Sequence, residues 1–172
     1  ECDGWTLEQG GKYYVTRNGS SIIAFHVGQQ LDNYHFQITA SHSDSPSYKV
    51  KEKAELKGKG GYLQLNTEGY GGMICSSWLD RPLSLAGRVL VRQGNVVETR
   101  LLNIDRDLLL IPNVAIHMNR DVNSGMKYNQ QVDMLPLFSA GECGENSYYE
   151  LIAQELGVKP EDVVGCDLYL YP

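Results

Sequence analysis

Residues 85–102, LAGRVLVRQGNVVETRLL, decide the fold class of this chain. Two runs of aliphatic and β-branched residues flank Gln93-Gly94-Asn95, and such runs on either side of a glycine-bearing turn predict a β-hairpin. Successive side chains of a strand point to opposite faces of a sheet. We therefore expect the alternating residues of this hairpin to form one apolar face, which is either core or interface: Val89, Val91, Val97 and Leu101.

The segments before this hairpin also favour β-structure. Residues 12–17 and 20–28 are rich in aromatic and β-branched side chains, and they flank Asn18-Gly19, a dipeptide typical of a two-residue hairpin turn. Residues 34–40 alternate and predict a further strand, which ends at the polar sequence Ser41-His42-Ser43-Asp44-Ser45-Pro46. Because α/β enzymes commonly place their sites at strand ends, this sequence is a candidate site.

Lysines recur with a period of two at Lys49, Lys51 and Lys53. We expect them on the exposed face of an edge strand, where lysine discourages pairing with other chains. A contact with nucleic acid is the alternative. The whole section from residue 48 to residue 117 is predicted to be nearly all β.

One helix is predicted, over residues 147–156. Ser147 and Glu150 have the spacing of a capping box, in which each side chain satisfies an early backbone amide. Apolar residues then recur at helical spacing, and Gly157 is expected to end the helix in the left-handed conformation. Residues 167–171 predict a final strand.

The composition excludes several classes of protein. The chain has 172 residues, of which 42% are hydrophobic and 21% are charged, as in ordinary globular domains. Its formal net charge of −6 argues against a nucleic-acid partner, because binding to the phosphate backbone needs a basic face. No apolar run approaches the roughly 20 residues that a membrane-spanning helix needs, so we expect no membrane partner.

The four cysteines are far apart in the sequence and form no Cys-x-x-Cys pair. Scattered thiols at this low density are typical of reduced, structural cysteines. We therefore expect a cytoplasmic protein, with two disulfides as the alternative.

His42 is the strongest candidate for chemistry among the four histidines. Asp44 lies two residues further on, and side chains with this spacing share one face of a strand, so the carboxylate can orient the imidazole. A histidine that binds a metal commonly has such a partner, although His-x-Asp also occurs by chance. His26 and His35 are expected to be structural, and no histidine lies in a local zinc-binding pattern.

Segments along the whole chain, in the correct order, resemble the aspartyl aminopeptidase family of dinuclear zinc exopeptidases. Residues 41–46, SHSDSP, are similar to the family's metal-binding motif A-H-T-D-S-P. Residues 111–120, IPNVAIHMNR, resemble its I-P-x-L-A-I-H-L-x-R block. The other segments that carry the resemblance are Arg17-Asn18 with residues 20–25, Tyr70-Gly71-Gly72, residues 78–89 and residues 167–171.

The resemblance implies an enzyme that uses two zinc ions to hydrolyse peptides with an N-terminal Asp or Glu. It implies that His42 binds one zinc ion and that Asp44 orients this histidine or tunes the metal. Family members are longer and use five metal ligands, of which only His42 has a counterpart here, so this chain resembles a fragment that is inactive alone. His117 would reach into the active site of a partner subunit and donate a hydrogen bond to the oxyanion.

The resemblance also implies an α/β fold with a large β-rich inserted domain. Residues 1–47 would be part of the peptidase domain, residues 48–165 a β-rich dimerisation domain, and residues 166–172 a strand that returns to the peptidase domain. Self-association through the middle domain would give a higher homo-oligomer. Two rival functions are an oligomerisation module without chemistry of its own, and a peptide-binding module that docks peptides on the lysine-bearing edge strand.

Overall fold

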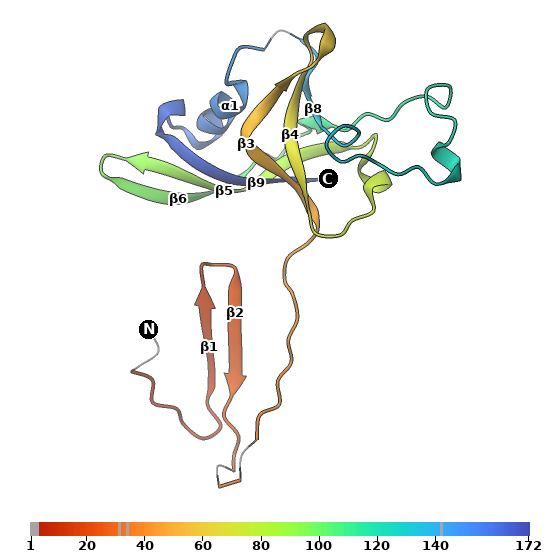
Figure 1. Ribbon diagram of the computed structural model, residues 1–172. Coiled ribbons are helices and arrows are strands. Elements are labelled where there is room, and N and C mark those ends of the chain that lie inside the picture. The colour runs from red at the N-terminus through yellow and green to blue at the C-terminus, as the bar shows by residue number, and fades with distance from the viewer. Residues whose placement is uncertain (1–3, 31, 34, 142) are drawn as a thin grey trace. The chain divides into compact units, whose positions relative to one another are not determined.

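The computed structural model describes residues 4–30, 32–33, 35–141 and 143–172 (Figure 1). The chain divides into two compact units, residues 1–44 and residues 45–172, and each unit is described by itself. The described residues are mostly β, with a single α-helix among them. None of the helices described is long and apolar enough to cross a membrane.

The smaller unit contains the first predicted hairpin. Strand β1 (Lys12–Arg17) pairs antiparallel with β2 (Ser21–His26). Asn18 and Gly19 both have positive φ angles, 53° and 65°, as the tight hairpin turn requires. On one face the rings of Tyr13 and Phe25 stack with their centroids 5.4 Å apart. The hairpin prediction is confirmed.

The strand predicted over residues 34–40 is not formed. Tyr34 lies outside the described residues, and residues 35–46 are extended without a partner strand in the described part of the chain. The alternating pattern indicates which side chains a sheet would bury, but a strand also needs a neighbour for its backbone hydrogen bonds. Ile38, which the pattern would place on a sheet face, is 84% exposed.

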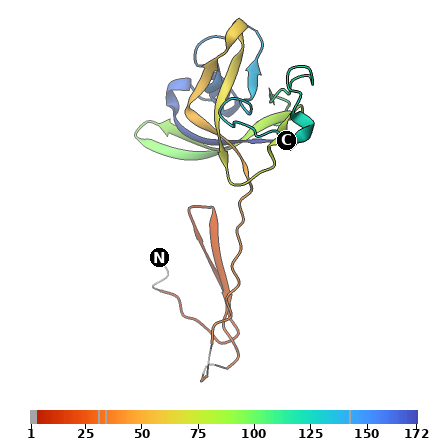
Figure 2. The same ribbon diagram turned by 45° about the vertical axis from the view of Figure 1, so that its right-hand side comes forward.

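The larger unit is a six-stranded antiparallel barrel with an additional outer strand (Figure 1, Figure 2). Its strand order is β5-β7-β8-β4-β3-β9, and β9 pairs with β5 to close the ring. Strand β6 pairs with β5 and lies outside this ring. The strands are β3 (Ser47–Lys57), β4 (Leu63–Tyr70), β5 (Pro82–Gln93), β6 (Val96–Asn103), β7 (Leu109–Leu110), β8 (Leu137–Ser139) and β9 (Val163–Tyr171).

One apolar core fills the barrel and the space beneath the helix. The largest of its fully buried side chains come from four strands, from the helix and from the connections between them, and they belong to one cluster. These side chains are Tyr48, Leu65, Leu83, Leu85, Val89, Ile104, Ile111, Met134, Tyr148, Ile152, Leu168 and Leu170.

The final strand lies in this barrel. The division between the two units falls between Asp44 and Ser45, whereas the sequence placed a boundary after residue 47. Strand β9 pairs with β5 along most of its length and with β3 at Lys49↔Tyr169. Within this chain β9 therefore belongs to the larger unit, and the domain limits of a longer protein stay a prediction.

The lysine-bearing strand is not an edge strand, as the sequence had suggested. Strand β3 lies between β4 and β9 in the closed barrel. Lys49 contacts Asp167, and the ammonium of Lys51 donates a hydrogen bond to Gln131 Oε1 at 2.6 Å. The periodic lysines therefore mark the outer face of a barrel strand, which a single sequence cannot distinguish from an edge.

The second predicted hairpin is formed by β5 and β6, but its apolar face is not the expected one. Val89 lies opposite Arg100 and Val91 opposite Glu98, and both valines are fully buried. Leu101 lies opposite Arg88 on the other face and is 83% exposed. The register of a hairpin decides which residues share a face, and it shifts the two valines away from Val97 and Leu101.

Helix α1 (Ser147–Leu156) confirms the predicted helix, and Gly157 ends it with a φ angle of 63°. The predicted capping box is wrong. Ser147 donates its hydroxyl to the backbone oxygen of Gly144. The first turn is capped instead by Glu55 of β3, whose carboxylate accepts hydrogen bonds from the backbone N–H groups of Asn146 and Tyr148, at 3.1 and 2.7 Å. This cap comes from 91 residues away in the sequence.

The remaining helical segments are single 3₁₀ turns. Their bounds are Lys59–Gly61, Cys75–Trp78, Val122–Ser124 and Pro160–Asp162.

Candidate functional site

His42 and Asp44 lie in contact at the end of the smaller unit. Nδ1 of His42 is 3.2 Å from Oδ1 of Asp44 and 3.0 Å from the backbone oxygen of the same residue. The segment is extended without strand pairing, and the two-residue spacing nevertheless brings the imidazole and the carboxylate together. The structure therefore confirms the predicted contact between these two side chains.

The two acceptors of Asp44 select one tautomer of the histidine. A carboxylate and a carbonyl oxygen cannot donate, so Nδ1 carries the proton that bridges to them. Nε2 then presents its lone pair outward, and the side chain of His42 is 82% exposed. An imidazole held in this way is suited to bind a metal ion through Nε2.

A complete metal site needs more ligands than this pair supplies. No group of three or more His, Cys, Asp or Glu side chains with metal-binding geometry occurs among the described residues. His26 lies in β2, and neither it nor His35 contributes to such a group there. The donor chemistry of His42 fits one ligand of a zinc site, and the described residues do not form a complete site around it.

His117 belongs to the larger unit, so its position relative to His42 is not assigned. It lies in the long connection between β7 and β8, which projects from the barrel (Figure 1, teal). The backbone N–H of Met118 donates to the oxygen of Ala115 at 2.8 Å and closes a turn around His117. The side chain of His117 is exposed, and its catalytic role stays a prediction.

Asp80 holds the start of this connection, and sequence analysis did not single it out. Its backbone N–H donates to the oxygen of the fully buried Ile111 at 3.0 Å, and its Oδ1 accepts the backbone N–H of Asn113 at 2.8 Å. The end of the connection is held by Gln131, which accepts from Lys51 and donates to the backbone oxygen of Thr67 at 3.1 Å. The local signal for Asp80 is weak, because only the fold brings residue 80 beside residue 113.

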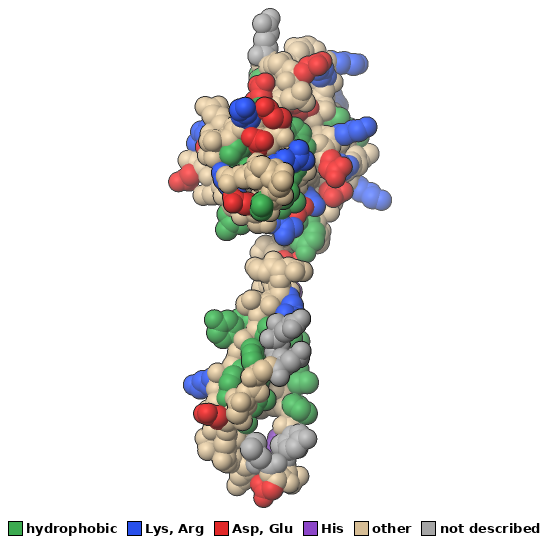
Figure 3. Space-filling view, turned by 90° about the vertical axis from the view of Figure 1, so that its left-hand side faces the viewer, with side chains coloured by type: hydrophobic (Ala, Val, Ile, Leu, Met, Phe, Trp, Pro, Cys, Tyr) green, Lys and Arg blue, Asp and Glu red, His purple; other side chains and the backbone are tan. Residues whose placement is uncertain are grey.

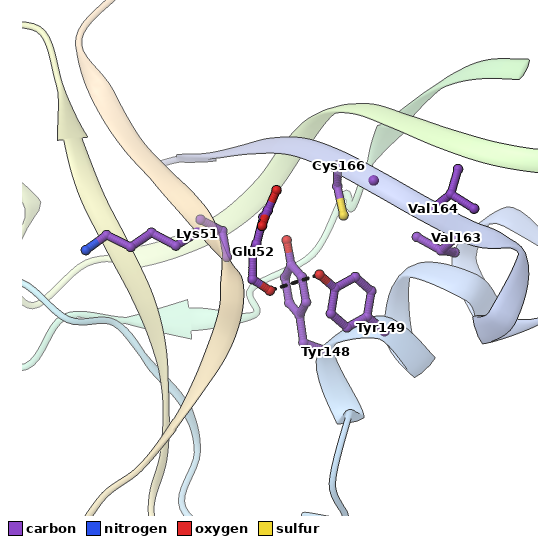
Figure 4. Close-up of a pocket in the computed structure, with 9 residues that line it drawn as sticks. Lys51, Glu52, Tyr148, Tyr149, Val163, Val164 and Cys166 are labelled. Carbon is purple, nitrogen blue, oxygen red and sulfur yellow. Dashed lines mark hydrogen bonds between the residues drawn. The ribbon is translucent and has the colours of Figure 1, made fainter. Parts of the chain in front are cut away.

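A pocket of about 350 Å³ lies elsewhere, between β3, α1 and β9 (Figure 4). Tyr149 donates its hydroxyl to the backbone oxygen of Glu52 at 3.0 Å, and Lys51 points away from the tyrosine rings. Burial raises the pKa of Tyr148 and also that of the Cys166 thiol, so both groups stay protonated at neutral pH. This pocket contains none of the predicted site residues and offers no activated nucleophile.

Charges of both signs are mixed on the surface of the larger unit. On the face drawn in Figure 3, lysines and arginines alternate with acidic side chains, and no broad basic patch is seen there. Such a surface gives no support to the nucleic-acid alternative for the lysine-bearing strand.

A family model and two curated relatives carry descriptions of the same family. Residues 1–172 match the family model described as "Aminopeptidase I zinc metalloprotease (M18)". The chain is 49% identical over 173 residues to "Probable M18 family aminopeptidase 2" of Clostridium acetobutylicum, with 97% of this chain and 40% of that protein covered. It is 43% identical over 177 residues to the protein of the same description from Clostridium novyi, with 99% and 41% covered.

Solved structures share the fold. A chain of the cryo-EM structure of the Ape4 and Nbr1 complex superposes with a TM-score of 0.79 at 37% identity, covering 95% of this chain and 35% of that chain. Chaetomium thermophilum mApe1 superposes with a TM-score of 0.75 at 29% identity, covering 96% and 41%. This chain therefore spans about 40% of the length of the curated relatives it matches.

Proposed function

The chain belongs to the M18 family of zinc metalloproteases, and on that premise we propose that it is part of a dinuclear zinc aminopeptidase that removes N-terminal Asp or Glu from peptides. The observation that carries the proposal is the contact between His42 and Asp44, which leaves Nε2 of His42 open to a metal. The other ligands, the general base and the α/β core of the peptidase domain would belong to the longer protein.

His42 would bind one zinc ion through Nε2, and Asp44 would keep the proton on Nδ1 and fix the plane of the ring. Zinc ions at such a site polarise the scissile carbonyl and lower the pKa of a bound water. A carboxylate in the position of Asp44 raises the basicity of the ligand and prevents the ring from turning away. The work of this chain is therefore to orient one ligand.

His117 would act on the reaction in a partner subunit. Its exposed turn, which Asp80 holds at the base, supports a role outside its own barrel. There its imidazole would donate a hydrogen bond to the oxyanion that develops on the scissile carbonyl. This role requires a homo-oligomer, and we propose that the barrel, residues 45–172, mediates its assembly.

The acidic substrate preference and the cytoplasmic location are also proposals. The resemblance of residues 41–46 and 111–120 to the aspartyl aminopeptidase motifs supports the preference for Asp and Glu. Cys75, Cys143 and Cys166 are free thiols, which supports a reducing compartment.

The first experiment tests the metal ligand. In the full-length enzyme, His42→Ala should lower the zinc content per subunit after dialysis, and Asp44→Asn should weaken zinc affinity by about 10- to 100-fold. His26→Ala is the matched control and should leave zinc content unchanged. The metal proposal would be contradicted if the His42→Ala enzyme kept full zinc content and wild-type turnover of aspartyl p-nitroanilide. The proposed acidic preference would be contradicted if the wild-type enzyme turned over leucyl and aspartyl substrates equally.

The second experiment tests catalysis across subunits. His117→Phe should lower kcat by at least about 100-fold without changing the oligomeric state, because a transition-state donor is lost. When His117→Phe and His42→Ala subunits are mixed and reassembled, each mixed pair contains one intact site. Activity should then return to about one quarter of the wild-type value if assembly pairs subunits at random across a symmetric interface. No recovery in verified mixed oligomers would exclude the action of His117 in a partner subunit.

A further inference from the structure

We propose that Asp80 is a positioning residue that holds the turn carrying His117 in its working orientation. The inference rests on the proposed role of His117 and adds the contact that fixes this histidine from within its own barrel. Asp80 follows the 3₁₀ turn Cys75–Trp78 and precedes β5, so it stands on the rigid barrel rather than on the projecting connection.

Asp80 makes hydrogen bonds to the residues on both sides of Pro112. Its backbone N–H donates to the oxygen of Ile111 at 3.0 Å, and Leu79 and Ile111 form a parallel β-bridge beside this bond. Its carboxylate accepts the N–H of Asn113 at 2.8 Å. Pro112 has no N–H of its own to donate, and the two bonds are made by the carbonyl before it and the amide after it. Asp80 therefore holds the chain at the point where the connection leaves the barrel, beside the bridge between Leu79 and Ile111.

A short series of local hydrogen bonds connects Asn113 to the turn around His117. Oδ1 of Asn113 accepts the N–H of Val114 at 2.9 Å, and the turn around His117 is closed by Met118 N–H and Ala115 oxygen. In the described part of the chain, no other hydrogen bond joins residues 112–118 to the barrel. The carboxylate of Asp80 thus holds Asn113 at the start of an exposed turn, and the backbone N–H of the same residue holds the fully buried Ile111.

The backbone of Asp80 is strained to make this contact. Its φ angle is +54°, in the left-handed region that few residues other than glycine occupy. Aspartate and asparagine tolerate this region better than other residues because their short polar side chains bond nearby backbone groups. Strain of this kind persists where surrounding contacts enforce it, and it is concentrated at functional sites. The side chain is exposed, so its role is not to fill the core.

A donor to an oxyanion is effective only when it is held within a fraction of an ångström of its working position. Loss of the Asp80 carboxylate should therefore slow the chemical step more than it weakens substrate binding. The barrel should remain folded, because the residues of its core are untouched.

Three variants of the full-length enzyme separate the contributions. Asp80→Gly keeps the positive φ angle without strain and removes the acceptor. Asp80→Asn keeps both the backbone conformation and an oxygen acceptor for Asn113. Asp121→Gly is the control for added flexibility, since Asp121 lies in the same connection and its side chain caps nothing in the following 3₁₀ turn.

Asp80→Gly should lower kcat by at least about tenfold, with KM changed less than about twofold, and Asp80→Asn should retain near-normal kcat. Hydrogen exchange at the amide of Asn113 should accelerate by at least about tenfold in Asp80→Gly, and not in Asp80→Asn or Asp121→Gly. The double variant Asp80→Gly/His117→Phe should be no slower than His117→Phe alone, because the two residues act as a unit.

Suppose that His117→Phe lowers kcat as expected. The inference is then overturned if Asp80→Gly has wild-type kcat, or if the fold-losses of kcat in the two single variants multiply in the double variant. If His117→Phe keeps normal kcat, the proposed role of His117 in the partner's site fails. Hydrogen exchange then decides on Asp80 alone: unchanged protection of Asn113 in Asp80→Gly overturns its positioning of the turn.

Discussion

Lys49 and Asp167 form an ion pair at the seam where the barrel closes, with Nζ 2.8 Å from Oδ1. The same two strands pair through their backbones at Lys49↔Tyr169. Arg88 of β5 donates to the second oxygen of Asp167 at 2.6 Å. One carboxylate on β9 therefore joins three neighbouring strands, at the point where the first and last strands of the barrel meet.

This cluster should make stability depend on pH. The Lys49 ammonium, and next the Arg88 guanidinium, hold the pKa of Asp167 below its ordinary value. A carboxyl whose pKa is lower in the folded state stabilises the fold above its unfolded pKa, and this stabilisation is lost as the pH falls through the folded pKa. Asp167→Asn should therefore reduce stability at pH 7, by about 0.5–1 kcal/mol for a pair about one-third exposed.

Thermal unfolding of both proteins from neutral to acid pH measures this effect. The two curves should converge once the pH lies below the ordinary range for carboxyl groups, and the difference at pH 7 should shrink in high salt. Glu145→Gln removes a far more exposed pair with Lys57 and should change little. A difference between wild type and Asp167→Asn that stays constant with pH would contradict the assignment.

Glu55 should be the residue that caps helix α1. Glu55→Ala leaves the N–H groups of Asn146 and Tyr148 without their carboxylate, and it should reduce the free energy of unfolding by about 1–2 kcal/mol. Ser147→Ala should cost at most a few tenths of a kcal/mol, because this hydroxyl bonds Gly144 outside the helix. Urea denaturation of both variants gives the comparison, and equal losses would restore the capping box predicted from the sequence.

Gly87 should tolerate no side chain. A Cβ at this position would lie 2.1 Å from the backbone oxygen of Asp167, and the φ angle of +152° is one that residues with a side chain rarely adopt. Gly87→Ala should push β9 away from β5 and destabilise the barrel by about 2–4 kcal/mol. Gly72→Ala, where the added methyl meets nothing, is the matched control. If chemical denaturation finds the two variants equally stable, the prediction is wrong, because the strands can then move apart without loss of stability.

The outer face of the β5–β6 hairpin should contribute to self-association. Val97 and Leu101 are 53% and 83% exposed and lie opposite Arg92 and Arg88. Val97→Glu/Leu101→Glu places carboxylates beside these arginines, so the hairpin should stay folded while the apolar contact is lost. The dissociation constant from light scattering should rise at least about tenfold, which corresponds to ~1.4 kcal/mol. Ile74→Glu, an exposed residue outside the hairpin, should leave it unchanged; an equal effect would mean that the association is unspecific.

The sequence by itself determined the local features, those that depend on a few consecutive residues. Asn18-Gly19 set the first hairpin turn, Gly157 ended the helix, and the two-residue spacing of His42 and Asp44 brought a carboxylate to an imidazole. Each of these features depends on the allowed backbone angles and reach of a few consecutive residues. They could therefore be predicted without knowledge of the rest of the fold.

Only the tertiary structure decided the features that join distant segments. The closure of β9 onto β5 and β3 removed the edge expected at the lysines, and the hairpin register moved Val89 and Val91 away from Leu101. Glu55 caps the helix in place of Ser147, and Asp80 accepts a hydrogen bond from Asn113. Alternation specifies a face of a strand but not its neighbour, because pairing and register are selected by the packing of the whole core.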